Sequence, residues 1–148
     1  MVSIMKKIVI CDIDGTIANN DHRQHYLEGK KDWEGFFSEL INDEPIFPII
    51  NKVIEEYNTG KEIVFLTGRP ERYRNVTTEW LKRYFDFEIK LLMRKNKDHK
   101  NKLIIKREIF ELNFNVKDIF LIFENDKELI AMWEDIGANI FDVNESDY

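Results

Sequence analysis

Residues 8–16 read Ile-Val-Ile-Cys-Asp-Ile-Asp-Gly-Thr, and they set the expectation for the whole fold. The first four residues are apolar without interruption, which is typical of a parallel strand covered on both faces. Two carboxylates, Asp12 and Asp14, follow where this apolar run ends. The pattern therefore predicts a first strand over residues 6–13, with both acids at its carboxyl end.

Further strands and helices are expected to alternate along the rest of the chain. Apolar periodicity predicts strands over residues 62–67, 88–93, 118–123 and 139–143. The same signals, with Asp32 and Asp126 as N-caps, predict helices over 33–41, 46–57, 70–84, 102–112 and 127–136. This alternation implies right-handed crossovers and an α/β fold, with a Rossmann-like parallel sheet of about five strands and helices on both faces.

Composition indicates one ordinary globular domain over residues 1–148. Hydrophobic residues make up 43% of the chain and charged residues 34%, which argues against disorder. The longest apolar run, 119–123, is too short to span a bilayer, and Lys6 and Lys7 interrupt the apolar stretch that a signal peptide needs. One cysteine, Cys11, leaves no internal disulfide. These features favour a cytoplasmic protein without a membrane partner.

The charge of the chain is unevenly distributed. The net charge is −6, which disfavours nonspecific binding along a nucleic-acid backbone. Residues 90–107, however, hold eight basic side chains and one acidic one, so this segment is +7 and the rest is −13. The segment is either a site for an anionic ligand or a solvated loop and helix face, and charge alone does not decide between them.

Polar residues follow three of the predicted strands. Asp12 and Asp14 end the first strand, residues 67–69 (Thr-Gly-Arg) end the second, and residues 124–126 (Glu-Asn-Asp) end the fourth. In open α/β sheets ligands bind outside the carboxyl ends of the strands, so these groups are expected to meet at one edge. An oxygen-rich set without His or Cys favours Mg²⁺ over zinc.

Such a set of residues is suited to phosphoryl transfer. A carboxylate beside Mg²⁺ can attack phosphorus, because the cation offsets the repulsion between anions. A second carboxylate two residues further on can act as acid and base. A hydroxyl and a lysine can hold the phosphoryl oxygens, and Thr67 and Lys106 are the candidates for these tasks.

Four motifs in order resemble those of the haloacid dehalogenase-like (HAD) phosphatases. They are Asp12-Ile13-Asp14-Gly15-Thr16, Leu66-Thr67-Gly68-Arg69-Pro70, Lys106, and Glu124-Asn125-Asp126. Over nearly its whole length the chain is most similar to the 3′-phosphatase domain of phage polynucleotide kinases and to related small phage nucleotidase-like phosphatases. It contains no Gly-x-x-x-x-Gly-Lys-Ser/Thr motif, so we expect a stand-alone phosphatase without a kinase half.

The resemblance implies a role for each matching residue. Asp12 is expected to be the nucleophile that forms an aspartyl-phosphate, and Asp14 the general acid and base. The expected Mg²⁺ ligands are Asp12, the backbone carbonyl of Asp14, and Glu124, with Asn125 beside them. The residues expected to bind the substrate are Thr67, Gly68, Arg69, Arg94 and Lys106. Residues from about 17 to 45 are expected to form a small cap inserted after the first strand.

The fourth motif departs from the family pattern. Kinase-phosphatase domains usually carry Asp-Asp-Arg where this chain has Glu124-Asn125-Asp126. Glutamate is one methylene longer, Asn125 supplies no second charge, and the arginine is missing. Metal geometry, metal affinity and substrate choice are therefore expected to differ from the pattern.

Three classes of function are compatible with the sequence. The first is an Mg²⁺-dependent phosphomonoesterase that acts on nucleic-acid 3′ ends, or alternatively a 5′/3′-nucleotidase that acts on free nucleoside monophosphates. The second is a receiver-like phospho-binding module, and the third is a scaffold without catalytic activity. Trp33, Phe36 and Phe37 have the helical spacing of core residues, which favours packing over base stacking. His22 and His25 are expected at the surface, and the oligomeric state is left open.

Overall fold

The computed structural model describes residues 7–145 and contains one five-stranded parallel sheet. Its strands are β1 (Ile8–Cys11), β4 (Glu62–Pro70), β5 (Leu91–Arg94), β6 (Ile119–Glu124) and β7 (Ile140–Asp142). They lie in the order β5-β4-β1-β6-β7, and every neighbouring pair is parallel. This confirms the predicted α/β fold and its strand number.

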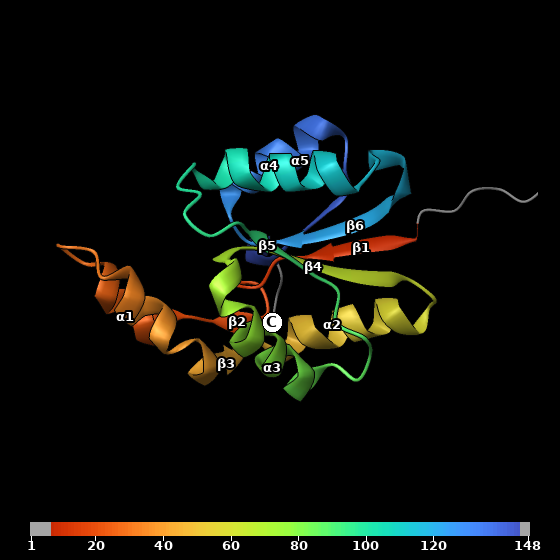
Figure 1. The fold of residues 1–148 in the computed structure, drawn as a ribbon. Helices are drawn as coiled ribbons and strands as arrows, with labels where there is room; N and C mark the ends of the chain where they lie inside the picture. Colours follow the sequence, from red (N-terminus) through yellow and green to blue (C-terminus); the bar gives the residue numbers. More distant parts are fainter. Residues whose placement is uncertain (1–6, 146–148) are drawn as a thin grey trace, which may run out of the picture.

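Helices cover both faces of the sheet (Figure 1). Helices α2 (Phe47–Asn58) and α3 (Arg74–Tyr84) cover one face, and α4 (Lys102–Asn113) and α5 (Lys127–Ile136) cover the other. Successive residues of β1 point to opposite faces, so Val9 and Cys11 join the first core and Ile10 joins the second. The uninterrupted apolar run of β1 is explained by these two cores. Within residues 7–145, every helix is too short or too polar to cross a bilayer.

Element ends differ from the sequence predictions at several points. β1 begins at Ile8, and residue 6, the predicted start, lies outside the described residues. Pro70 does not begin a helix, because its extended backbone (φ −65°, ψ 147°) ends β4 and pairs it with Arg94. A 3-10 turn, η3 (Glu71–Tyr73), precedes α3. β5 begins at Leu91, three residues later than predicted.

The helix caps agree with the sequence predictions. The Asp32 side chain accepts a hydrogen bond from the Gly35 N–H at the start of α1 (Trp33–Ser38). The Asp126 side chain caps α5 in the same way, and Gly137 ends that helix with φ 99°. Two short 3-10 helices complete the C-terminal half, η4 (Val116–Asp118) and η5 (Val143–Glu145).

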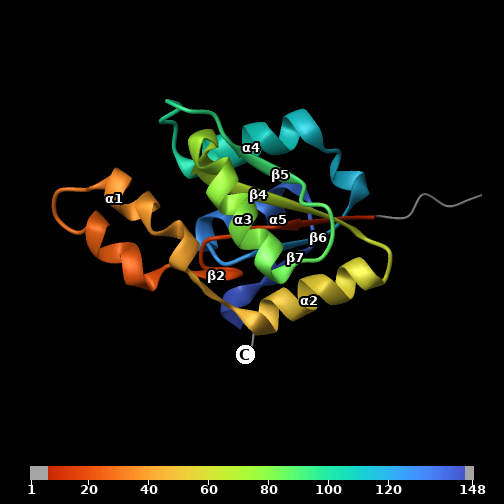
Figure 2. The same cartoon turned by 60° about the horizontal axis from the view of Figure 1, so that its bottom comes forward.

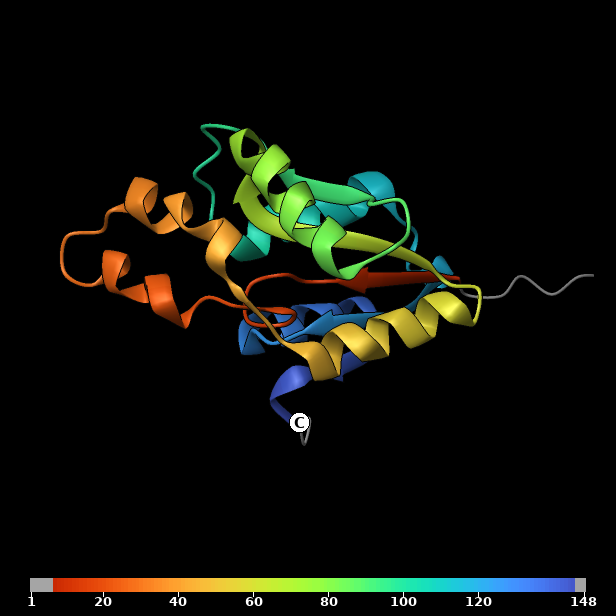
Figure 3. The same cartoon turned by 90° about the horizontal axis from the view of Figure 1, so that it is seen from below.

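The insertion (residues 17–45) lies beyond the carboxyl ends of the sheet strands. Strands β2 (Ala18–Asn19) and β3 (Glu44–Pro45) pair in antiparallel fashion at its base. Between them the chain forms η1 (Asp21–Leu27), α1 and η2 (Leu40–Asn42). Figures 2 and 3 show this segment projecting to one side of the sheet, at the end where β1 points.

Candidate active site

The motif at residues 67–69 lies on an irregular part of β4. Pairing with β5 is regular at Leu66 and resumes only at Pro70, so the Thr-Gly-Arg segment bulges out of the ladder. Within the bulge the Arg69 N–H donates to Thr67 Oγ1 at 3.2 Å. A bulge turns side chains away from the regular alternation. Because β4, β1 and β6 are neighbours in the sheet, their polar ends meet at one edge, as predicted.

Asp12 lies at the centre of this edge and is buried. Its Oδ1 accepts a hydrogen bond from Lys106 Nζ at 2.7 Å, and its Oδ2 accepts one from Thr16 Oγ1 at 2.9 Å. Burial, and then the charge of Glu124, raise the pKa of Asp12, whereas the charge of Lys106 opposes this shift and favours the carboxylate that it pairs with. Burial alone would lower the pKa of Lys106, but Asp12 and Glu124 raise it, so the lysine stays charged.

Glu124 is held by donors on both of its carboxylate oxygens. Oε1 accepts hydrogen bonds from Lys106 Nζ at 3.3 Å and from Trp133 Nε1 at 3.2 Å. Oε2 accepts from the backbone N–H groups of Asn125 and Asp126, at 3.1 and 3.3 Å. Glu124 therefore fixes Lys106 beside Asp12, while Asp126 is occupied as the cap of α5 and as the partner of Lys102.

The side-chain amide of Asn125 closes the other side of Asp12. The amide atom that points into the site lies 2.9 Å from Asp12 Oδ2, 3.0 Å from the Asp14 carbonyl oxygen and 3.1 Å from Thr16 Oγ1. With its NH₂ group turned inward, Asn125 donates to these oxygens. Gly15 (φ 81°) makes room for the amide, since a Cβ there would clash with the side-chain amide of Asn125.

Asp12 Oδ2, the Asp14 carbonyl oxygen and the amide oxygen of Asn125 fit a magnesium ion when that amide oxygen faces inward. Octahedral Mg²⁺–O distances of about 2.0–2.1 Å place adjacent ligand oxygens roughly 2.9–3.0 Å apart. The spacings to Asp12 Oδ2 and to the Asp14 carbonyl match that value. Nowhere in residues 7–145 do three His, Cys, Asp or Glu side chains form a metal-binding group. The fit therefore depends on one carboxylate, one backbone carbonyl and one amide.

Asp14 is held by two arginines. Arg23 Nη2 donates to its Oδ1 at 2.6 Å, and Arg69 donates to Oδ1 at 2.8 Å and to Oδ2 at 3.1 Å. Burial alone would raise the pKa of Asp14, but Arg69 and then Arg23 hold that pKa at about 2. The carboxyl group is 28% exposed, so it reaches the surface of the site as an anion.

Asp43 bonds to both of the arginines that hold Asp14, Arg23 and Arg69. Its carboxylate accepts from Arg23 at 2.8 Å through each oxygen and from Arg69 Nη2 at 3.2 Å. His22 Nε2 lies 2.7 Å from Asp43 Oδ1, and His22 is an exposed residue, as predicted. Arg69 also donates to Thr77 Oγ1 at 3.1 Å, which leaves it engaged by protein groups on every side. Arg69 thus supports Asp14, and its expected role in binding the substrate stays a prediction.

Arg94 is engaged by backbone carbonyls. Its Nε donates to Gly68 O at 2.9 Å, and its Nη1 donates to Asp98 O at 3.0 Å and to Lys100 O at 2.6 Å. These bonds attach the basic loop (residues 95–101) to the bulge of β4. Arg94 also lines the groove beside Gly68, and its expected role in binding the substrate stays a prediction.

Sequence reasoning missed Arg23, Asp43 and the contact of Thr16 with Asp12. Thr16 belongs to the first motif, and its hydroxyl reaches Asp12 because residues 12–16 fold into a tight turn. Arg23 lies in the 3-10 helix η1, and Asp43 directly follows η2. Their partners, Asp14 and Arg69, are distant in the sequence, so no local pattern marks them.

A family model described as the polynucleotide kinase PNKP phosphatase domain matches residues 6–148. The chain belongs to this family. Membership makes it a HAD-type phosphatase, a phosphoric monoester hydrolase, which confirms the expected family and enzyme class.

Relatives with known names support this assignment. A protein of Autographa californica nuclear polyhedrosis virus, "Putative bifunctional polynucleotide kinase/RNA ligase", is 28% identical over 133 residues, which are 88% of this chain and 18% of that protein. A chain of the solved "Pnkp1/Rnl/Hen1 complex" is 27% identical with a TM-score of 0.78, over 97% of this chain and 48% of that one. The class C acid phosphatase from Bacillus anthracis, solved with tungstate bound, is 18% identical with a TM-score of 0.57, over 88% of this chain and 62% of that one. It shares the fold.

This phosphatase-domain chain spans only part of its relatives. It covers 18% of the viral protein and 48% of the chain in the Pnkp1/Rnl/Hen1 complex. The activities of the remaining parts of those proteins therefore do not transfer with the similarity.

Proposed function

We propose that this phosphatase removes the terminal phosphate from nucleic-acid 3′ ends, with Mg²⁺ as cofactor and Asp12 as the nucleophile. The observation that carries the proposal is the pairing of Asp12 with Lys106 at the carboxyl end of β1, with Asn125 and ionised Asp14 beside it. The names of the family and of the relatives, which concern polynucleotide ends and RNA repair, supply the substrate class.

In the first step Asp12 attacks the phosphorus atom, and the bond between phosphorus and the 3′ oxygen breaks. Lys106 stabilises the charge on the phosphoryl oxygens, and Thr67 is the second residue proposed to hold them. Bound to Asp12, the Asp14 carbonyl and Asn125, Mg²⁺ would offset the repulsion between the carboxylate and the phosphate. The leaving 3′ oxygen takes a proton from Asp14, and the aspartyl-phosphate remains on Asp12.

In the second step a water molecule attacks the aspartyl-phosphate and releases inorganic phosphate. Asp14 accepts the proton of that water, and it can do so because its carboxyl group is ionised at neutral pH. The first step needs Asp14 in its protonated form. A phosphate dianion placed next to the carboxyl raises its pKa, so substrate binding itself favours the uptake of that proton.

We propose further that residues 1–148 act as one domain in which the insertion (residues 17–45) is a small cap. Arg23 and Asp43 come from the insertion, and they bond to Asp14 and Arg69 of the sheet domain. A cap that is fixed in this way orients the acid–base residue and leaves the site open to a polymer end.

Turnover of a small aryl phosphate tests the catalytic part of the proposal. We expect hydrolysis with Mg²⁺, loss of activity in EDTA, and recovery on Mg²⁺ addition. Asp12→Asn should abolish turnover, because an amide is a poor nucleophile, whereas Asp135→Asn on the exposed side of α5 should not. Activity that persists in Asp12→Asn, or after complete chelation, would refute the mechanism. No turnover in the wild type would favour the phospho-binding or scaffold alternatives.

A further inference from the structure

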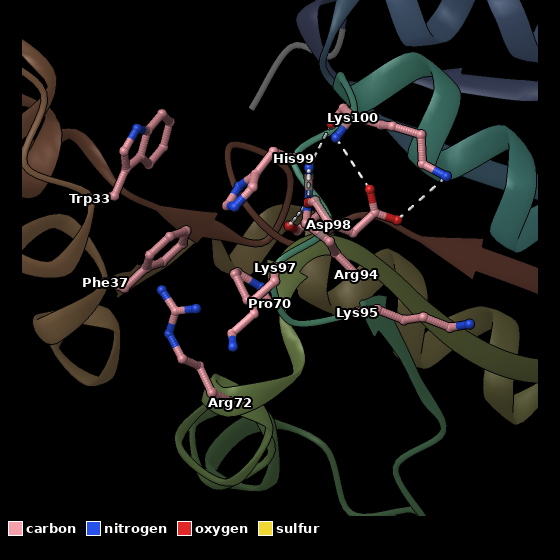
Figure 4. Close-up of a pocket in the computed structure, with 11 residues that line it drawn as sticks. Trp33, Phe37, Pro70, Arg72, Arg94, Lys95, Lys97, Asp98, His99 and Lys100 are labelled. Atoms are coloured by element: carbon pink, nitrogen blue, oxygen red, sulfur yellow. Dashed lines mark hydrogen bonds and ion pairs between the residues drawn. The ribbon is translucent and has the colours of Figure 1, made fainter.

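A groove of about 420 Å³ opens between helix α1 and the basic loop, next to Gly68 (Figure 4). Trp33 and Phe37 of α1 form one wall, and residues of the basic loop form the other. Gly68 lines the groove and directly follows Thr67 in the bulge of β4, so the groove borders the proposed phosphate site. A ligand held at Asp12 therefore has this groove as a neighbouring space.

The wall on α1 is a row of aromatic rings. Trp33 and Phe37 lie 6.0 Å apart at 25° to each other, and Phe37 lies 4.7 Å from Tyr73. Trp33 is 48% exposed, whereas Phe36 in the same helix is 6% exposed. The helical spacing thus predicts core packing correctly for Phe36 and wrongly for Trp33. An exposed tryptophan in a row of rings is a surface on which a planar ligand can stack.

The opposite wall is cationic and has a fixed backbone. Arg94 holds the loop through the carbonyls of Asp98 and Lys100, as described above. Lys100 is paired with Glu108, but no ion pair within residues 7–145 involves Arg72 or Lys97. Figure 4 shows the Arg72 guanidinium near Phe37, and His99 directed from the loop toward the aromatic wall. Arg72 and Lys97 thus lie without an ion-pair partner among the described residues, beside the stacked rings of Trp33 and Phe37, although the protein has a net charge of −6. This combination indicates a ligand that has both a planar ring and a negative charge.

We infer that this groove binds the 3′-terminal nucleoside of an unpaired nucleic-acid strand, with the base against Trp33 and Phe37 and the next phosphodiester toward Arg72 and Lys97. The inference rests on the proposed function, and it adds the strand state of the substrate. A base within a duplex is paired at its edge and stacked on its neighbour, so it cannot lie against the tryptophan face. An unpaired end can place both base and backbone in the groove.

Binding without turnover tests the groove separately from catalysis. A labelled single-stranded DNA oligonucleotide with a 3′-phosphate is titrated in EDTA, and its anisotropy gives Kd. We expect Trp33→Leu to weaken binding at least tenfold, whereas Phe47→Leu, an exposed aromatic on α2, leaves Kd unchanged. An oligonucleotide with an abasic 3′-terminal residue should bind weakly to the wild type, and it should not discriminate between the wild type and Trp33→Leu.

Wild-type tryptophan fluorescence gives a second readout. Trp80 and Trp133 are each 1% exposed, so quenching by the oligonucleotide should report mainly on Trp33. Equal Kd values for wild type and Trp33→Leu, or tighter binding of a blunt duplex with the same 3′-phosphate, would overturn the inference. If binding depends on Trp33 and no phosphate is released from any ester, the proposed function fails while the groove assignment stands.

Discussion

Asn125 lies where a second acid would normally reinforce a magnesium site. Its amide is 2.9 Å from Asp12 Oδ2, and it can present either oxygen or NH₂ to that carboxylate. When the amide oxygen of Asn125 faces inward, it lies beside Asp12 Oδ2 and the Asp14 carbonyl oxygen, and the three oxygens suit a cation. When the NH₂ group faces inward, it donates hydrogen bonds to those two oxygens instead. As ligands of the proposed Mg²⁺, these groups would supply one formal negative charge, which would favour weak metal binding completed by the substrate phosphate.

Asn125→Asp should tighten magnesium binding by adding a carboxylate to the ligand set. We expect the Mg²⁺ concentration for half-maximal turnover to fall several-fold, because affinity follows the ligand charge. The melting temperature should also rise more on Mg²⁺ addition than it does in the wild type. Asn139→Asp, the same change on an exposed residue before β7, is the control. An unchanged Mg²⁺ requirement would mean that Asn125 is not a ligand.

Asp14 should make the stability of the protein sensitive to acid. Arg69 and Arg23 hold the pKa of Asp14 at about 2, below its ordinary value of 3.8. The ionised Asp14 therefore adds about 2 kcal/mol to the free energy of unfolding above pH 4. This contribution is lost as the pH falls toward 2, because the carboxylate becomes protonated. Urea unfolding at pH 5, 4 and 3 should show a smaller loss of unfolding free energy in Asp14→Asn than in the wild type. Parallel curves for the two proteins would contradict the ion-pair network.

At the scale of elements, the bulge of β4 and the basic loop form one unit. Regular pairing between β4 and β5 would leave residues 67–69 alternating across the sheet, and the bulge instead turns them toward the site. Arg94 then connects this bulge to the loop through three backbone carbonyls. The shape of the groove therefore depends on a single guanidinium group.

Arg94→Lys should loosen the basic loop, because an ammonium group cannot reproduce the planar fork of arginine. We expect faster trypsin cleavage after Lys95 and Lys97, and a loss of about 1 kcal/mol in the free energy of unfolding. Arg107→Lys, which changes an exposed arginine paired with Glu111, should cleave like the wild type. Unchanged cleavage in Arg94→Lys would show that other contacts hold the loop.

Sequence reasoning predicted elements better than contacts between them. Periodicity found the five strands and the long helices, because each has its own apolar pattern, and Asp32 and Asp126 marked helix starts through capping chemistry. It missed the extension of β4 to Pro70, since the bulge depends on pairing with a distant strand. The roles of Arg69 and Arg94 depend on distant partners too, so the sequence could place these side chains near the site but not identify their contacts.

At the scale of the whole molecule, an acidic protein presents a basic face next to its candidate active site. Lys95 and Lys97 of the basic loop are exposed, and neither has an ion-pair partner in the described part of the chain. The contrast with the net charge of −6 explains how such a protein could bind a polyanion at one place only. A mononucleotide would need only the inner groups around Asp12.

Salt dependence should distinguish these two kinds of substrate. For a 3′-phosphorylated oligonucleotide we expect kcat/KM to fall steeply with salt. Lys95→Ala/Lys97→Ala should flatten the log–log slope by about 0.7 for each phosphate that a lysine no longer neutralises. Lys82→Ala/Lys117→Ala, which removes two lysines away from the groove, should keep the wild-type slope. Equally shallow slopes in all three proteins would argue for a mononucleotide substrate.

Phosphate release from matched substrates is the most direct test of a 3′-phosphatase. The panel holds one single-stranded oligonucleotide phosphorylated at its 3′ end or at its 5′ end, together with the 3′- and 5′-mononucleotides. We predict that the 3′-phosphorylated strand has the highest kcat/KM and that Asp12→Asn abolishes its hydrolysis. Faster release from the 5′-phosphorylated strand, or from mononucleotides of either kind, would contradict the assignment and favour a nucleotidase.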